Sequence, residues 1–299
     1  MQPNARIAAA IEILDSMLSE QPVERCLTTW ARTHRFAGSS DRAAIRDAVF
    51  DAVRCQRSYA WLGGGLTGRG LMIGAMRAQG EPLDAVFTGQ GHAPSELTEA
   101  EHAALPFDAS DMPEPVRLDC PDWLWPMVTD AYPEMAVQIL QTLQTRAPVF
   151  LRVNRAKATR SDAIATLAED EIEAAPHKLS DTALEVTEGA RRLRNARAYR
   201  DGLVELQDAA SQAVVDQCLA LGDSPTALDY CAGGGGKALA LAAGGVPAVT
   251  AHDANPGRMS DLPDRAARAG ATITNVETVT GTFDLVLCDA PCSGSGAWR

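Results

Sequence analysis

The stretch TALDYCAGGGGKALALAA, residues 226–243, sets the pattern for the C-terminal third of the chain. A short apolar run ends at Asp229, four glycines follow at positions 233–236, and an alanine- and leucine-rich segment begins with Lys237. This order predicts a strand, a tight turn and a helix. Because glycine has no side chain, the turn lets the backbone approach a bound molecule closely.

The same alternation continues beyond this stretch. Residues 248–270 indicate a strand, a turn and a helix, and two further strands are expected in ATITNVETV (271–279) and FDLVLCDA (283–290). Strands that alternate with helices specify a parallel sheet with helices on its faces. We expect FDLVLCDA to lie beside the first strand, and to be an interior strand because it is apolar on both faces.

A cofactor is expected at one edge of this sheet, since ligands bind beyond the carboxyl ends of parallel strands. Asp253 ends the second strand, twenty residues after Gly233, where a carboxylate can accept both hydroxyls of a ribose. Gly233, Gly235 and Ala238 also match the loose G-x-G-x-x-A pattern, which tight packing alone can produce. An NAD enzyme would use the same elements. It has no need of Asp-Ala-Pro-Cys at 289–292, whereas a methyltransferase acting on a base needs polar groups there.

At DAPCSGSGAWR (289–299) the C-terminal third resembles the Sun/NOL1/NOP2 family of S-adenosylmethionine-dependent RNA cytosine-C5 methyltransferases. GLVELQDAASQAVV (202–215) resembles the segment that precedes the family's methyltransferase core. PVFLRVNRAKATR (148–160) and the β-α-β pattern after it resemble its small RNA-recognition-like subdomain. DRAAIRDAVFDAVRCQRSYAWL (41–62) resembles the NusB-like helical domain of the bacterial 16S rRNA branch.

The resemblance implies an α/β fold in three parts. An all-helical NusB-like domain is expected at 1–140, a small α+β RNA-recognition-like subdomain at 141–201, and a Rossmann-like methyltransferase domain at 202–299. Apolar residues at helical spacing through residues 1–80 agree with the first part. We expect Asn4 to cap the first helix, Ser40 or Asp41 to cap a helix near residue 40, and Asp208 or Ser211 to cap the helix after 208.

The family's chemistry gives roles to several residues. C5 of cytosine is a poor nucleophile until a thiolate adds to C6. The catalytic residues that the resemblance implies are Lys237, which can bond the O2 or N3 side of the base, Asp289, which can accept from N4, and Cys292, which helps to release product. We expect Asp229 to steady the glycine turn, and Cys288 to be a core residue. The cofactor-binding residues implied for S-adenosylmethionine are Cys231, Ala232, Gly233, Gly234, Gly235, Gly236, Lys237, Asp253 and Asp289.

The sequence departs from the family's pattern in two places. The family's loop usually reads Cys-Ala-Ala-Pro-Gly-Gly-Lys, and here Gly233 and Gly234 stand where alanine and proline are usual. The loop therefore loses a fixed φ and should be more flexible before ligand binds. The family's attacking cysteine lies in a Thr-Cys pair after the next strand, and this chain contains no Thr-Cys pair. We expect the chain to be truncated after Asp-Ala-Pro-Cys, without the nucleophilic cysteine or a fifth strand.

Charge is distributed unevenly along a chain whose net charge is −12. Residues 141–200 carry 11 Lys/Arg and 8 Asp/Glu, a local balance of +3. Within them, RRLRNARAYR is either a solvated basic face or a strip that contacts RNA phosphates, with Tyr199 for stacking. The arginines of this predicted RNA-binding strip are Arg191, Arg192, Arg194, Arg197 and Arg200.

The cysteines and the apolar runs bear on whether the chain is a metal-binding, disulfide-bonded, membrane or secreted protein. The seven cysteines include no Cys-x-x-Cys pair, so neither a zinc site nor a disulfide framework is indicated, and no metal is expected. No apolar run is long enough to cross a bilayer, and the start lacks a signal-peptide core. We expect a cytoplasmic, monomeric protein with RNA as its partner.

Three functions remain open. The first is an S-adenosylmethionine-dependent methyltransferase that forms 5-methylcytosine in RNA, with 16S rRNA as the expected substrate. The second is a non-catalytic RNA- or ribosome-binding module that keeps the donor-binding fold. The third is a DNA-type cytosine methyltransferase that uses the Pro-Cys thiol as nucleophile, but the RNA-recognition-like segment has no place in such an enzyme.

Overall fold

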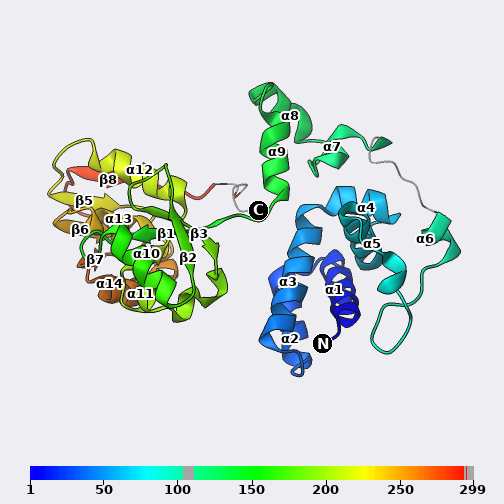
Figure 1. The fold of residues 1–299 in the computed structure, drawn as a ribbon. Coiled ribbons are helices and arrows are strands. Elements are labelled where there is room, and N and C mark those ends of the chain that lie inside the picture. The colour runs from blue at the N-terminus through cyan, green and yellow to red at the C-terminus, as the bar shows by residue number, and fades with distance from the viewer. Residues whose placement is uncertain (104–110, 293, 295–299) are drawn as a thin grey trace. The chain divides into compact units, whose positions relative to one another are not determined.

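The computed structural model describes residues 1–103, 111–292 and 294. The chain folds into two compact units, one of Met1–Ala147 and one that begins at Pro148 (Figure 1). The predicted boundary after residue 140 falls inside a helix that continues to Gln144. Each unit has a hydrophobic core of its own.

The first unit is helical throughout its described regular structure. In its largest core, Leu14, Ile45 and Val49 of the apolar residues at helical spacing are fully buried, and Leu71 is fully buried with them. No described helix combines the length and the apolar character that crossing a bilayer requires. The helices are α1 (Pro3–Leu18), α2 (Val23–Thr33), α3 (Ser39–Arg54), α4 (Gln56–Gly63), α5 (Gly68–Gln79), η1 (Leu83–Ala85), α6 (Glu99–Ala103), α7 (Glu114–Arg117), α8 (Trp125–Ala131) and α9 (Ala136–Gln144).

Two predicted helix caps in this unit are wrong. Gln2 occupies the N-cap of α1, and Asn4 lies inside the helix. Gly38 occupies the N-cap of α3. Asp41, at the third helical position, instead accepts a hydrogen bond from the Gly38 amide at 3.3 Å. An acidic side chain at the third helical position can accept from the N-cap amide, and an N-cap side chain can accept from the amide of the third position. Both arrangements occur near a helix start, so sequence spacing alone does not tell which of them a given acidic residue adopts.

The second unit begins with a four-stranded antiparallel sheet in the order β2-β3-β1-β4. The predicted β-α-β pattern covers β1, α10 and β3, and the structure adds β2 as a strand that the pattern did not show. Its sequence, Glu-Ala-Ala-Pro, has few residues that favour strands, and pairing with β3 decides its conformation. The elements are β1 (Val149–Val153), α10 (Arg160–Glu169), β2 (Glu173–Pro176), β3 (Ala183–Glu188), η3 (Ala190–Asn195), α11 (Arg197–Arg200) and β4 (Val204–Leu206).

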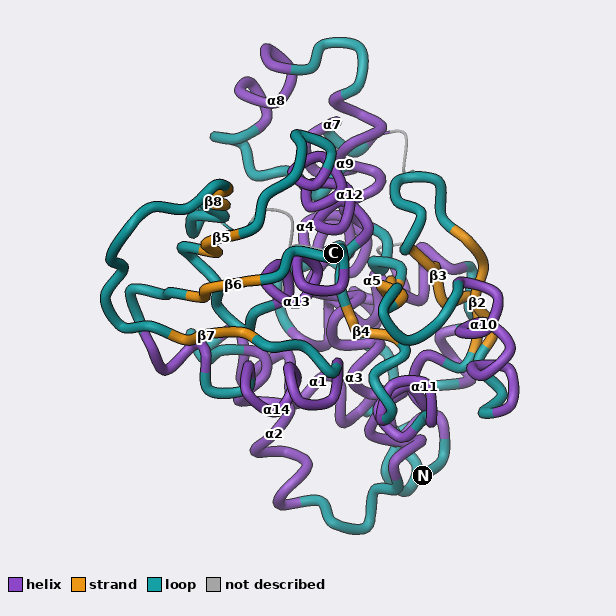
Figure 2. Tube along the Cα trace, turned by 90° about the vertical axis from the view of Figure 1, so that its left-hand side faces the viewer, coloured by secondary structure: helices purple, strands orange, loops and turns teal. Residues whose placement is uncertain are grey.

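A parallel sheet in the order β7-β6-β5-β8 follows, as predicted, with β8 beside β5 (Figure 2). Asp208 caps the helix before it, as expected, by accepting from the Ala210 amide at 2.8 Å. Within the described residues β8 pairs only with β5, and Val286 is 53% exposed, so the interior position expected for this strand is not observed. The elements are α12 (Ala209–Leu219), β5 (Thr226–Asp229), α13 (Gly236–Ala243), β6 (Ala248–Ala251), η4 (Pro256–Met259), α14 (Leu262–Ala269), β7 (Ile273–Asn275) and β8 (Leu285–Leu287).

Polar contacts join the two sheets of the second unit. Asn154, directly after β1, is 5% exposed and donates to the carbonyls of Gly202 and Ala269 at 3.0 and 2.8 Å. Lys157 donates to the Arg268 carbonyl at 2.7 Å. The last carbonyls of α14 therefore receive donors from the small subdomain, which satisfies groups that a helix end leaves unpaired.

We predict that Asn154→Ala lowers the free energy of unfolding by about 2–4 kcal/mol, because it leaves two carbonyls without their donor. Urea unfolding followed by circular dichroism measures the change. The matched control is Asn195→Ala, since Asn195 is exposed and should change stability by less than about 0.5 kcal/mol. Equal effects of the two substitutions would contradict the prediction.

Candidate cofactor and catalytic site

The glycine loop joins the end of β5 to the start of α13. Gly233 and Gly235 have φ values of +51° and +79°, a conformation that glycine adopts without strain. A Cβ atom on Gly235 would lie 2.1 Å from Cδ1 of Leu262, a fully buried residue of α14. Gly235 is therefore required both by its conformation and by the close packing of α14 against the loop.

Asp253, two residues after β6, holds the other side of this loop. It is 3% exposed, and its two oxygens accept from the amides of Gly233 and Asn255, each at 2.9 Å. Arg258 lies 3.3 Å from the same carboxylate. The Asn255 amide, the Gly233 amide and the Arg258 guanidinium lower the pKa of Asp253. The residue predicted to bind ribose thus also ties β6 to the glycine loop.

Lys237 and Asp289, two of the predicted catalytic residues, are brought together. Nζ of Lys237 lies 2.5 Å from Oδ2 of Asp289. Lys237 is in the first turn of α13 and Asp289 is two residues past β8. Because β5 and β8 are parallel neighbours, the segments that follow them meet at one edge of the sheet. The lysine side chain is 14% exposed and the aspartate side chain 59% exposed, so the carboxylate is open to a ligand.

Asp229, the last residue of β5, is buried and has no hydrogen-bond partner for either carboxylate oxygen within the described part of the chain. Burial raises the pKa of Asp229 to about 6, and the amide of Ala238 and the charge of Lys237 act in the opposite direction. An unpaired buried carboxylate next to a glycine loop fits a ligand that carries a positive group. The residues of this edge therefore suit the cationic methionine end of S-adenosylmethionine.

The three cysteines of this edge differ in exposure. Cys292 is exposed, and its Sγ accepts from the Gly294 amide at 3.5 Å. Cys231, directly after Tyr230, is half-buried. Cys288 is exposed, so its prediction as a core residue is wrong: Leu285 and Leu287 of β8 are buried and Val286 is exposed, and this alternation puts Cys288 on the exposed side.

Three arginines that the sequence patterns did not single out surround the loop. Arg258 contacts Asp253, Arg265 of α14 donates to the Gly234 carbonyl, and Arg152 of β1 donates to the Gly236 carbonyl at 2.7 Å. No local sequence pattern identifies Arg258 or Arg265, because Arg258 lies in η4 and Arg265 in α14. Nothing near Arg152 in the sequence points to the loop.

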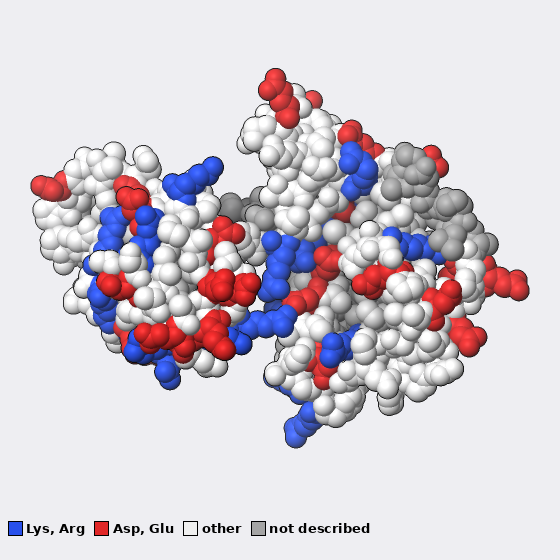
Figure 3. Space-filling model, viewed as in Figure 1, with Lys and Arg blue, Asp and Glu red and all other residues white. Residues whose placement is uncertain are grey.

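The predicted RNA-binding arginines lie on η3 and α11 of the small subdomain, and all five are exposed. Arg192 lies 2.5 Å from Glu171 and Arg197 lies 2.7 Å from Glu169, so part of their charge is balanced locally. Figure 3 shows basic and acidic side chains interspersed over the visible face of this unit. Across the described residues, no three His, Cys, Asp or Glu side chains gather closely enough to hold a metal ion.

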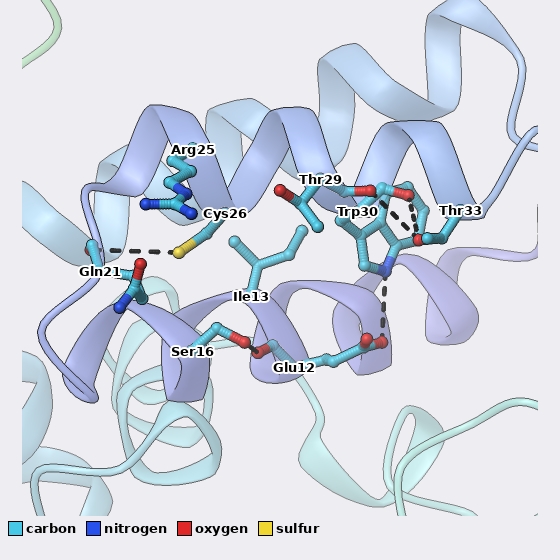
Figure 4. Close-up of a pocket in the computed structure, with 9 residues that line it drawn as sticks. All are labelled: Glu12, Ile13, Ser16, Gln21, Arg25, Cys26, Thr29, Trp30 and Thr33. Carbon is cyan, nitrogen blue, oxygen red and sulfur yellow. Dashed lines mark hydrogen bonds between the residues drawn. The ribbon is translucent and has the colours of Figure 1, made fainter.

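A separate cavity of about 320 Å³ lies in the first unit, between α1 and α2 (Figure 4). Ile13, Cys26 and Trp30 form its apolar part, and the indole Nε1 of Trp30 donates to Glu12 at 3.2 Å. Arg25 lies at its border. None of the residues predicted from the sequence to act on substrate or cofactor lines it.

Two family descriptions match parts of the chain. Residues 120–191 match "Methyltr_RsmF/B-like, ferredoxin-like domain". Residues 216–299 match "16S rRNA methyltransferase RsmB/F". The second match covers α13, the glycine loop before it and the segment after β8, which together carry the predicted cofactor and catalytic residues.

Curated relatives carry a related name. Ribosomal RNA small subunit methyltransferase B of Shigella boydii is 32% identical over 210 residues, which cover 67% of this chain and 47% of that protein. The protein of the same name from Yersinia pseudotuberculosis is 32% identical over 189 residues, which cover 60% of this chain and 44% of that protein. The chain thus spans about half the length of the curated relatives it matches.

Solved structures share the fold. The crystal structure of PH0851 has a TM-score of 0.67 at 20% identity and covers 99% of this chain, which in turn covers 76% of PH0851. A methyltransferase homolog protein from Pyrococcus horikoshii has a TM-score of 0.54 at 20% identity, with 64% of this chain and 66% of that chain covered. NSun6 from Pyrococcus horikoshii, solved with SFG, has a TM-score of 0.50 at 15% identity, with 57% and 71% covered.

We predict that Asp229→Asn stabilises the ligand-free chain by about 3 kcal/mol at pH 7.5, because the folded-state pKa of about 6 lies well above the ordinary value of 3.8. A raised carboxyl pKa means that wild-type stability is greatest below the unfolded pKa and falls as pH rises through 6. The advantage of the variant should therefore shrink as pH falls from 7.5 to 5.

Urea unfolding of both proteins at the two pH values measures this difference. Asp223→Asn is the matched control, since Asp223 is exposed in the loop before β5. A stability difference that does not change with pH would contradict the titration of Asp229.

Proposed function

We propose that this chain, which belongs to the Sun/NOL1/NOP2 family of methyltransferases, binds S-adenosylmethionine and forms 5-methylcytosine in RNA, with 16S rRNA as its substrate. The observation that carries the proposal is the Lys237–Asp289 pair, which lies beside the glycine loop and joins the two motifs on which the family resemblance rests. The names of the relatives support a ribosomal RNA substrate. The C5 position follows from the family resemblance of residues 289–299.

The donor would lie along the glycine loop, with Asp253 toward its ribose and Asp229 near its methionine end. When bound, S-adenosylmethionine supplies an electrophilic methyl group. Asp253 already accepts two amides, but a carboxylate has about four acceptor positions, so it can accept ribose hydroxyls as well. The absence of side chains at 233–236 leaves the backbone amides accessible to the donor.

The target base would lie against Asp289, Lys237 and Cys292. Asp289 uses Oδ2 for Lys237, which leaves Oδ1 for the N4 amine of cytosine. Lys237 keeps further ammonium hydrogens for the O2 or N3 side of the base. In the resembled family the thiolate that adds to C6 belongs to a Thr-Cys pair, which residues 1–299 do not contain. Cys292 would act after methyl transfer, when the proton at C5 is removed and that thiolate leaves C6.

Deletion of the gene should remove 5-methylcytosine from one position of 16S rRNA, as read by bisulfite sequencing or mass spectrometry. The intact gene should restore the modification, and a gene carrying Asp289→Ala should not, because the carboxylate holds both Lys237 and the base. The matched control is Asp284→Ala, whose carboxylate bonds Thr226 at the other end of β8. An unchanged 5-methylcytosine profile after deletion would favour a non-catalytic RNA-binding module.

Binding to a 16S rRNA fragment should depend more on the arginines of the strip that have no ion pair than on those paired with a glutamate. Arg194 and Arg200 are exposed and have no ion pair within the described residues, so replacing both with alanine should reduce the log–log salt slope by about 0.7–0.9 per lost phosphate contact. Arg192→Ala with Arg197→Ala is the matched control and should reduce it less. Equal slopes in wild type and both double variants would assign the strip to a solvated face.

A further inference from the structure

The carbonyl of Gly234 accepts a hydrogen bond from an arginine, at a position where the pattern of the resembled family has a proline. Gly233 and Gly234 replace the Ala-Pro of the resembled family, which leaves the loop without a fixed φ. In the structure, Nη1 of Arg265 donates to the Gly234 carbonyl oxygen. This hydrogen bond to a charged group is the kind of contact that can hold a flexible segment in one conformation.

The space beside Gly234 is used by that arginine. A Cβ atom on Gly234 would lie 2.8 Å from Nη1 of Arg265, closer than side-chain atoms normally approach. The Gly234 amide makes no backbone hydrogen bond within the described residues, so a proline there would remove none. The loop can therefore be fixed at position 234 in two alternative ways. Either a glycine leaves room for the Arg265 hydrogen bond, or a proline fixes the backbone without that bond.

Arg265 is itself held by the small subdomain. Its Nη2 lies 3.5 Å from Oε1 of Glu205, a residue of β4 that is 6% exposed. Glu205 also pairs with Arg268 at 2.7 Å. A second arginine, Arg152 of β1, is 4% exposed and donates to the Gly236 carbonyl. Two loop carbonyls are thus bonded by arginines that involve the antiparallel sheet: Arg152 is part of it, and Arg265 pairs with its Glu205.

We propose that Arg265 is a positioning residue for the methyl-donor site: it holds the Gly233–Gly236 loop in its donor-binding conformation in place of a proline, and Glu205 makes this hold depend on the small subdomain. The proposal rests on the proposed function for the identity of the ligand. The positioning role itself is independent of the proposed function, because Arg265 fixes the loop before any ligand binds.

The test is a double-mutant cycle on S-adenosylhomocysteine binding, measured by calorimetry. Arg265→Ala should raise Kd roughly tenfold, the loss expected for one hydrogen bond to a charged group. In the Gly234→Pro background the same substitution should raise Kd by less than about threefold, because the proline now fixes the loop. The same factor in both backgrounds would overturn the proposal.

Arg268→Ala is the matched control. It removes the closer partner of Glu205 but no contact to the loop among the described residues, so stability should fall while Kd stays within about twofold of wild type. If Arg268→Ala and Arg265→Ala weaken binding equally, the effect belongs to general stability and the positioning role is wrong.

Hydrogen exchange of the peptide that covers residues 231–238 separates this proposal from the proposed function. Without ligand, Arg265→Ala should speed exchange there and Arg268→Ala should not. This readout is available even if wild type fails to bind S-adenosylhomocysteine, an outcome that would count against the proposed function alone. It also decides the question if Gly234→Pro does not fold, since unchanged exchange in Arg265→Ala would overturn the proposal.

Discussion

Four consecutive glycines cannot hold a loop in one shape, so the conformation of residues 233–236 depends on hydrogen bonds from outside the loop. Those bonds come from charged side chains on three different elements. Asp253 after β6 accepts the Gly233 amide, Arg265 of α14 binds the Gly234 carbonyl, and Arg152 of β1 binds the Gly236 carbonyl. The proposed donor site is therefore assembled by tertiary contacts around a backbone that has no conformational preference of its own.

These contacts place several charges where water is largely excluded. Arg152, Glu205 and Asp253 are each less than one tenth exposed, and desolvation of such groups is costly unless partners compensate for it. Burial lowers the pKa of Arg152 to about 10, while Asp253 is stabilised as an anion by two amides and Arg258. For Asp229 the Ala238 amide and the charge of Lys237 offset burial only in part, and a buried carboxylate with a raised pKa at a ligand edge is typical of a site that trades stability for binding.

The same side chains unite the two sheets of the second unit. Asn154 and Lys157 bind the end of α14, and Glu205 holds two arginines of that helix. The subdomain that carries the basic strip is thus fixed against the helix that packs on the glycine loop. In an RNA methyltransferase this arrangement would set the distance between RNA-contacting groups and the methyl donor without requiring a contact between the two ligands.

Local sequence patterns determined the parallel sheet, the place of β8 beside β5, the glycine turn and the acidic residue after β6, because strand–helix alternation and glycine runs act over a few residues. They also placed Lys237 and Asp289 at the same sheet edge. The tertiary structure alone decided that Arg152 reaches Gly236, 84 positions away, and that Arg265 reaches Gly234, 31 positions away. It also decided that β2 is a strand, that Cys288 faces solvent and that Asp229 has a raised pKa. Each of these depends on which distant groups exclude water or supply a partner, and no local pattern encodes that.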